Sequence, residues 1–140
     1  KTAYEIVDCD WSSDVCSSDL KHPNINIVIG HMGEGLPFSM WRVDNCNAWV
    51  PDRHKYPAKK RIADYFQSNF YITTSGNFHT PALLNTMMVV GADRILFSTD
   101  WPFENIDHAA LWFDAATISE EDRLKIGRTN AQKLFKLKGA

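Results

Sequence analysis

The sequence lacks several features that would place it in a specialised class of protein. No stretch approaches the roughly 18 consecutive apolar residues that a membrane-spanning helix needs, and no charged segment followed by an apolar one suggests a signal peptide. The net charge is only −2, which argues against a nucleic-acid or anionic membrane partner. Cysteine is scarce, and the spacing of Cys9, Cys16 and Cys46 matches neither a zinc motif nor a disulfide framework. We therefore expect a cytoplasmic protein with reduced thiols.

What the chain does contain is ordinary for a globular domain, apart from its aromatic residues. It has 140 residues, of which 44% are hydrophobic and 23% charged, as in a typical folded domain. Five Trp and eight Phe are many for this length. Aromatic side chains line pockets, but they fill cores more often, and we expect most of these to be core residues.

From residue 21 onward, short apolar runs alternate with helical patterns. The β-branched and aromatic runs that end near Gly predict strands, and apolar residues at intervals of three and four predict helices. Strands are expected over 25–30, 70–75 and 94–99, and helices over 34–49, 58–68, 80–91, from 105 or 107 through 113, and, with interruptions, 119–135.

Candidate caps mark the starts of several of these helices. Thr80 is expected to cap a helix that has Pro81 at its first position. Asn105 or Asp107 is expected to begin the next helix. Ser119, with an acidic residue three positions later, resembles a capping box.

The alternation of strands and helices predicts an α/β fold with parallel strands and right-handed crossovers. Three strands are too few for a well-packed two-sided α/β domain. They fit the last three strands of an eight-stranded (β/α)₈ barrel, but such a barrel needs about 250 residues. Length and pattern therefore disagree, and we expect a truncated, incomplete barrel.

The first predicted strand ends in a candidate acid–base pair. In α/β folds the chemistry lies at the carboxyl ends of the strands, and His31 follows the strand directly. Glu34, three residues later, is placed to bind one imidazole nitrogen and raise the basicity of the ring. Alternatively, His31 caps the strand and Glu34 belongs to the first helical turn.

The third predicted strand leads to Asp100. A carboxylate at the end of a buried strand is costly unless it is paired or bound to a metal, so Asp100 is a candidate metal ligand or proton carrier, or else an N-cap. Arg42 has the chemistry to clamp a substrate carboxylate, but it fits an ordinary surface arginine equally well. The second strand end, over 74–77, suggests no chemistry by itself. His22, His54, His79 and His108 are expected to be solvated or packing residues.

Several longer motifs carry a family resemblance. GHMGEGLPF (30–38), MWRVDN (40–45), YPAKKRIADYF (56–66), TTSGNF (73–78), GADRILFSTDWPFENIDHA (91–109) and GRTNAQKLFKL (127–137) resemble the metal-dependent aromatic acid decarboxylases of the amidohydrolase superfamily. Within it they are most similar to the γ-resorcylate (2,6-dihydroxybenzoate) decarboxylases. The resemblance covers about residues 21–140 and implies the C-terminal part, about strands six to eight, of a (β/α)₈ barrel.

The resemblance also implies roles for five residues. His31 matches a histidine that works beside the metal, and Glu34 the glutamate that orients it. Asp100 matches an aspartate that binds the metal and protonates the ring carbon. Arg42 matches an arginine that contacts substrate, across a subunit interface of a homo-oligomer, and Phe103 matches a pocket-lining position. The cofactor implied is a divalent metal, Zn or Mn, and the ligand a small aromatic carboxylic acid.

The sequence departs from that family in one large respect, because the earlier strands and most of their metal ligands have no counterpart. His31 and Asp100 alone cannot hold a catalytic metal, which usually has three protein ligands. Two alternatives to decarboxylation therefore stay open: hydrolysis of a lactone or related ester on the same barrel, and an inactive fragment.

Residues 11–20, WSSDVCSSDL, fit neither the family nor a regular element. They repeat Ser-Ser-Asp. A DNA sequence that encodes them can be written that resembles a common sequencing-library adapter read in frame. We interpret residues 1–20 as an artefactual or unrelated leader and 21–140 as the barrel portion. A Ser/Asp-rich linker and a metal loop at Cys16 are the alternatives.

Overall fold

Three parallel strands, β1 (Ile27–Ile29), β2 (Phe70–Thr73) and β3 (Ile95–Leu96), form a sheet in the order β1-β2-β3. The computed structural model describes residues 24–51 and 60–137. Strands that are consecutive in the chain are neighbours in the sheet, as in α/β barrels. The α/β fold and the parallel strands that the alternation predicts are both present.

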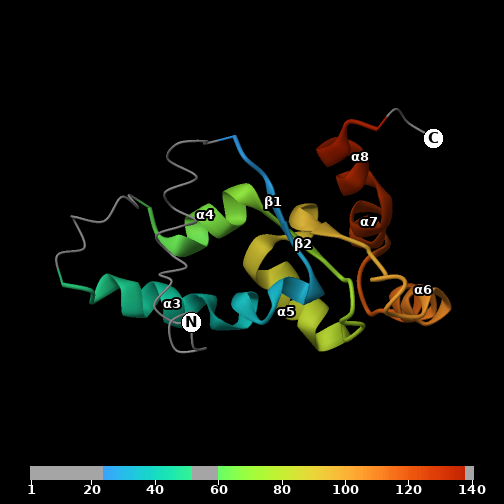
Figure 1. Ribbon diagram of the computed structural model, residues 1–140, viewed down its shortest axis with the longest axis horizontal. Helices are drawn as coiled ribbons and strands as arrows, with labels where there is room; N and C mark the ends of the chain where they lie inside the picture. The colour runs from blue at the N-terminus through green and yellow to red at the C-terminus, as the bar shows by residue number, and fades with distance from the viewer. Residues whose placement is uncertain (1–23, 52–59, 138–140) are drawn as a thin grey trace.

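Helices connect the strands and surround the sheet (Figure 1), with α3 and α4 to the left of the strands in this view and α6, α7 and α8 to the right. Helix α3 packs against both α4 and α5. Within the described ranges, no helix has the length and apolar character required to cross a lipid bilayer. The elements are η1 (His31–Gly33), α3 (Leu36–Ala48) and α4 (Ile62–Asn69) after β1; α5 (Thr80–Val90) and η3 (Ala92–Arg94) after β2; and α6 (Ile106–Ala115), α7 (Glu120–Leu124), η4 (Lys125–Thr129) and α8 (Asn130–Phe135) after β3.

A row of isoleucines across the sheet forms the centre of the core. Ile72 pairs in register with Ile29 on one side and Ile95 on the other. Ile72 and Ile95 have no exposed surface, and both belong to the main hydrophobic cluster. Burial of each such side chain contributes about 1.5–3 kcal/mol, so Ile72 and Ile95 stabilise the centre of the sheet.

The aromatic residues divide between core and surface, so our expectation of core residues is only partly correct. Tyr65, Phe66, Phe70 and Phe113 are buried. Large apolar side chains are nevertheless exposed along α3 and in the turn after β3, namely Phe38, Trp41, Trp49, Trp101 and Phe103.

The structure corrects the predicted start of α5 and decides between the two predicted starts of α6. The N-cap of α5 is His79 and not Thr80, and Pro81 is the second helical residue. The Thr80 hydroxyl instead accepts a hydrogen bond from Trp112 Nε1 at 3.2 Å, a tertiary contact that takes the place of capping. Asn105 is the N-cap of α6, because its side chain accepts from the His108 backbone N–H at 2.9 Å.

The remaining boundaries shift by a few residues. Helix α3 begins at Leu36 because Gly35 is left-handed, with φ 78°. Ser119 caps α7 as expected, accepting from the Asp122 N–H. The expected interruption in the last helix is the π-turn η4. The leader over 1–20, the start of the helix expected over 58–68, and Cys9, Cys16, His22 and His54 lie outside the described residues.

Thr74 extends the pairing of β2 with β3 beyond the ends of both strands. Its hydroxyl donates to the Ser98 carbonyl at 2.8 Å and accepts from the Ser98 N–H at 2.9 Å. Its own N–H donates to the Leu96 carbonyl at 3.1 Å. Thr74 is fully buried, so these bonds hold the segment that leads to Asp100 against the end of β2.

Replacing Thr74 with Val is expected to lower the free energy of unfolding by about 2 kcal/mol, because two partly buried backbone groups of Ser98 lose their partner. The measurement is urea unfolding of the full-length protein that carries this segment. Thr86→Val is the matched control: Thr86 is equally buried, but its hydroxyl bonds only to the Ala82 carbonyl of its own helix. Equal losses in the two variants would contradict the bridging role of Thr74.

Candidate functional site

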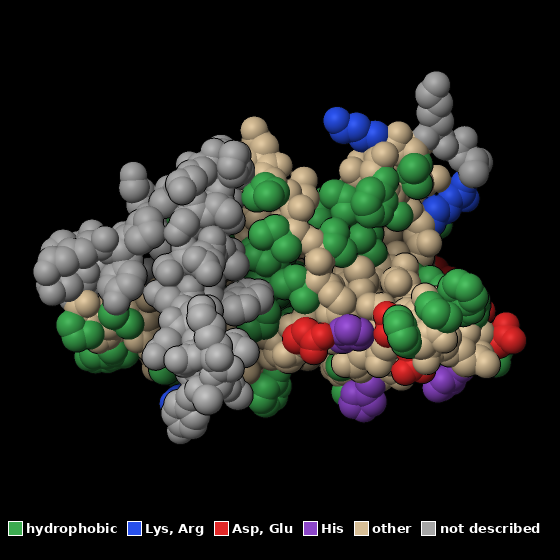
Figure 2. Space-filling view, in the orientation of Figure 1, with side chains coloured by type: hydrophobic (Ala, Val, Ile, Leu, Met, Phe, Trp, Pro, Cys, Tyr) green, Lys and Arg blue, Asp and Glu red, His purple; other side chains and the backbone are tan. Residues whose placement is uncertain are grey.

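His31 and Asp100, which are 69 positions apart in the printed sequence, meet at the carboxyl end of the sheet. His31 follows β1, and Asp100 lies in the segment after β3. The distance between His31 Nε2 and Asp100 Oδ2 is 3.4 Å. The structure thus brings together the two strand-end residues in which the sequence suggested chemistry. Figure 2 shows acidic and histidine side chains gathered along one edge of the molecule.

Glu34 completes a chain of three polar side chains. Its carboxylate oxygen Oε1 contacts His31 Nδ1, while Nε2 faces Asp100. The hydrogen bond that the His31 ring donates to the Glu34 carboxylate raises the pKa of His31; burial of the ring opposes this rise, and Asp100 raises the pKa further. A protonated imidazole donates from both nitrogens. The two carboxylates therefore favour the form of the His31 ring that carries a proton on Nδ1 and on Nε2.

Replacing Glu34 with Gln is expected to bring the pKa of His31 down towards its ordinary value, because Glu34 is the largest cause of the rise. A pKa that is higher in the folded than in the unfolded state stabilises the fold. This stabilisation is complete at pH values below the unfolded-state pKa and is lost as the pH rises through the folded-state pKa. The variant should therefore lose stability mainly on the acidic side.

The measurement is an NMR titration of the His31 ring in metal-free buffer. Glu120→Gln is the control, since Glu120 pairs with Arg123 in α7 and should leave the His31 titration unchanged. A Glu34→Gln protein that titrates like the unsubstituted protein would show that the contact does not persist in solution.

The backbone is left-handed at four non-glycine residues in this region. These are His31 (φ 49°), Met32 (φ 55°), Glu34 (φ 52°) and Asp100 (φ 66°). Each such residue costs about 1–3 kcal/mol and persists only where its surroundings impose it. Strain of this kind clusters at functional sites, which supports the strand ends as the site.

The end of β2 contributes contacts to which no sequence pattern assigned a role. The Ser75 hydroxyl accepts from the His31 backbone N–H at 3.3 Å and lies 2.7 Å from Thr73 Oγ1. Ser75 is buried. A Cβ placed on Gly76 would lie 2.7 Å from the His31 ring and 3.1 Å from Asp100 Oδ2. The only signal in the sequence was the Ser-Gly that follows a strand.

The side chains of Arg42 and Phe103 lie apart from the polar contacts that join His31 and Asp100. Arg42 lies on α3 and lines a separate hollow with Ser39, Val43 and Cys46. Phe103 is 86% exposed in the turn that its N–H closes on the Asp100 carbonyl at 2.9 Å. Their expected contacts with substrate stay predictions.

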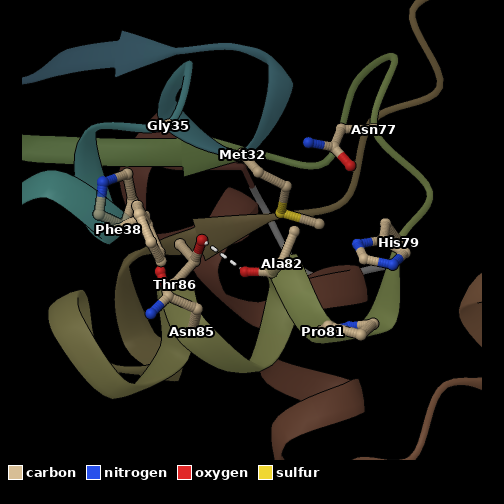
Figure 3. Close-up of a pocket in the computed structure, with 10 residues that line it drawn as sticks. Met32, Gly35, Phe38, Asn77, His79, Pro81, Ala82, Asn85 and Thr86 are labelled. Carbon is tan, nitrogen blue, oxygen red and sulfur yellow. Dashed lines mark hydrogen bonds between the residues drawn. The ribbon is translucent and has the colours of Figure 1, made fainter.

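A hollow of about 420 Å³ lies beside the site, between η1 and the start of α5. Figure 3 shows the Met32 sulfur directed into it, with Asn77 and His79 towards one end and Phe38 towards the other. His31, Glu34 and Asp100 do not line it. This hollow is therefore adjacent to the candidate chemistry and separate from it.

The donor set at the pair suits part of a divalent metal site. The side chain of Asp100 is 31% exposed, which leaves carboxylate oxygen accessible as a ligand. Over residues 24–51 and 60–137, however, no group of three or more His, Cys, Asp or Glu side chains is placed to hold a metal ion. A complete site would need ligands from outside these ranges.

Comparisons with known proteins identify the family of this chain. The family model described as Amidohydrolase matches residues 20–137. A γ-resorcylate decarboxylase from Rhizobium radiobacter is 66% identical over 118 residues, which are 84% of this chain and 36% of that protein. The chain thus spans little more than a third of the length of that relative.

Two solved structures are similar over the same portion. A 2,6-dihydroxybenzoate decarboxylase complexed with 2,6-dihydroxybenzoate is 62% identical with a TM-score of 0.82, covering 88% of this chain and 38% of that one. A dihydroxybenzoic acid decarboxylase from Polaromonas sp. JS666, with manganese and 2-nitroresorcinol bound, is 61% identical with a TM-score of 0.82, covering 90% and 38%. The α/β fold is that of these decarboxylases, and the chain belongs to the amidohydrolase family.

Proposed function

We propose that the full-length protein carrying this segment catalyses the metal-dependent, non-oxidative decarboxylation of a hydroxybenzoate such as 2,6-dihydroxybenzoate. The observation that carries the proposal is the approach of His31 to Asp100, 3.4 Å apart, where the parallel strands end. The names of the similar proteins support the substrate class. In this proposal β1, β2 and β3 are strands six to eight of a (β/α)₈ barrel.

Asp100 is proposed as both a metal ligand and the proton carrier. A divalent cation, Zn or Mn, would supply positive charge that neutralises the substrate carboxylate and the neighbouring hydroxyl. Asp100 delivers a proton to the ring carbon that bears the carboxylate. The bond from that carbon to the carboxyl group then breaks, its electron pair restores the aromatic ring, and carbon dioxide leaves.

His31 and Glu34 hold a proton beside Asp100. Glu34 fixes Nδ1 and directs Nε2 at Asp100, so the ring can return a proton to the Asp100 carboxylate between turnovers. Arg42 and Phe103 are proposed to contact substrate. Both are exposed, as expected of residues that act across a subunit interface of a homo-oligomer and in a pocket completed by other segments. A cytoplasmic location stays a prediction.

The 140-residue chain alone is expected to show no turnover and to bind metal weakly, because the described residues hold only part of a metal site. Along β1, Val28 is 45% exposed and, within the described sheet, β1 pairs only with β2. Unpaired strand edges promote association between chains, so this chain should also aggregate. Monomeric, active protein of this length would contradict the expectation.

The test is incubation of the full-length protein with 2,6-dihydroxybenzoate and Mn²⁺ or Zn²⁺, with detection of resorcinol and carbon dioxide. Treatment with a chelator should abolish turnover, and adding back the metal should restore it. Failure to turn over any hydroxybenzoate in the presence of metal, together with turnover of a lactone panel, would replace decarboxylation by hydrolysis.

A further inference from the structure

We propose that Gly76 is a positioning residue, whose missing side chain creates the space in which the His31 ring and the Asp100 carboxylate meet. An ideal Cβ at Gly76 would lie 2.7 Å from His31 Cδ2, 3.3 Å from His31 Nε2 and 3.1 Å from Asp100 Oδ2. One added methyl group therefore contacts both partners at once. Contacts below about 3 Å are strongly repulsive for carbon, whose optimal separation is about 3.5–4.0 Å.

Gly76 is held firmly in this place by the residues before it. Thr74 is bonded to Ser98 of the segment that leads to Asp100, and Ser75 accepts from the His31 N–H. The end of β2 is thus tied to both neighbouring strand ends. Moving the backbone of Gly76 alone therefore cannot relieve the clash that an added methyl group would cause.

The side chains are freer to move than this backbone. Those of His31 and Asp100 are 46% and 31% exposed in this chain, so neither is enclosed on all sides by the described residues and each can rotate away from an added methyl group. Alanine at position 76 should therefore push the imidazole and the carboxylate apart while leaving the fold in place. The consequence is lost alignment at the site with little loss of packing.

A turn requirement is the competing explanation for glycine here. Gly76 has φ +63°, in a turn closed by the bond from the Asn77 N–H to the Thr74 carbonyl at 3.1 Å. Any L-residue is strained at such a φ. Gly35 separates the two explanations, because it is also left-handed at φ +78° but a Cβ added there would have no atom within 4 Å.

The experiment compares Gly76→Ala with Gly35→Ala in the full-length protein. Crystal structures of both variants form the first arm, which is independent of the proposed function. The distance between His31 Nε2 and Asp100 Oδ2 should lengthen beyond hydrogen-bonding range in Gly76→Ala and stay near 3.4 Å in Gly35→Ala. An unchanged distance in Gly76→Ala would overturn the inference.

The second arm measures kinetics and rests on the proposed function. Gly76→Ala should lower kcat by about 10²-fold at similar KM, the scale of a misplacement of about 1 Å. Gly35→Ala should change kcat much less, because a Cβ added there has no atom within 4 Å. In a His31→Ala background, Gly76→Ala should cause little further loss, because coupled residues are not additive. Additive losses would overturn the inference. If the unsubstituted protein were inactive, the proposed function would be refuted. The crystal structures would then still decide whether Gly76 positions His31 and Asp100.

Discussion

Full-length protein carrying Asp100→Asn is expected to decarboxylate 2,6-dihydroxybenzoate about 10³-fold more slowly, or worse, which corresponds to about 4 kcal/mol of transition-state stabilisation. The substitution keeps the size of the side chain but removes both the transferable proton and the anionic oxygen. It therefore removes the two roles proposed for Asp100 in one step. The measurement is kcat from release of resorcinol at saturating substrate and metal.

Asp107→Asn provides the matched control for this prediction. Asp107 is exposed in the first turn of α6, seven positions after Asp100, and receives the same isosteric change. Its kcat should equal that of the unsubstituted protein. If Asp100→Asn kept more than about a tenth of the activity, less than about 1.4 kcal/mol would be lost, and neither role could belong to Asp100.

The second large effect is on stability. Ile72→Ala is expected to lower the free energy of unfolding by about 2–5 kcal/mol, the range for removing a buried aliphatic side chain from a packed core. Ile72 has no exposed surface and lies between Ile29 and Ile95 in the sheet. The cavity would open directly under Gly33, where an added Cβ would lie 3.2 Å from Ile72 Cδ1. The η1 turn, which begins at His31, would lose its support.

Urea unfolding of the full-length protein measures this loss. Met88→Ala is the control, because Met88 is a large apolar residue on α5 that is 87% exposed, and exposed substitutions usually change stability by less than about 0.5 kcal/mol. Comparable losses in the two variants would contradict the assignment of Ile72 to the centre of the core.

The strands, and the approach of His31 to Asp100 at the candidate site, were predictable because their signals are local. Short β-branched runs predicted the three strands, and the alternation of strands with helices predicted that the strands are parallel. The polar residues that follow the outer strands of the sheet, His31 and Asp100, were then expected to lie at one edge of the sheet. Asn105 was predictable as a cap for the same reason, since its bond reaches only to His108.

The contacts that hold the site together were not predictable, because they join distant segments. Ser75 reaches His31 across 44 positions. The His79 cap displaces Thr80 because the Thr80 hydroxyl bonds to Trp112, 32 positions away. Buried Asn130 donates to the carbonyls of Ala92 and Ile95 and fixes α8 against β3. No periodicity or spacing in the sequence encodes such pairs.

Left-handed backbone at non-glycine residues was also outside the reach of sequence patterns. Propensity favours glycine at positive φ, yet His31 and Asp100 both adopt it. Their conformation is imposed by tertiary contacts and not by their own preferences. Strained backbone of this kind clusters at functional sites, which supports His31 and Asp100 as candidate site residues.

A crystal structure of the full-length protein with Mn²⁺ and a nitro analogue of its hydroxybenzoate substrate would decide whether the chemistry takes place at Asp100 and His31. We expect anomalous density for manganese bound by the Asp100 carboxylate, with the His31 ring within hydrogen-bonding distance of Asp100 and the reacting carbon of the analogue facing that carboxylate. Manganese bound elsewhere, or an aromatic ligand remote from Asp100 and His31, would show that the reaction is carried out by other residues.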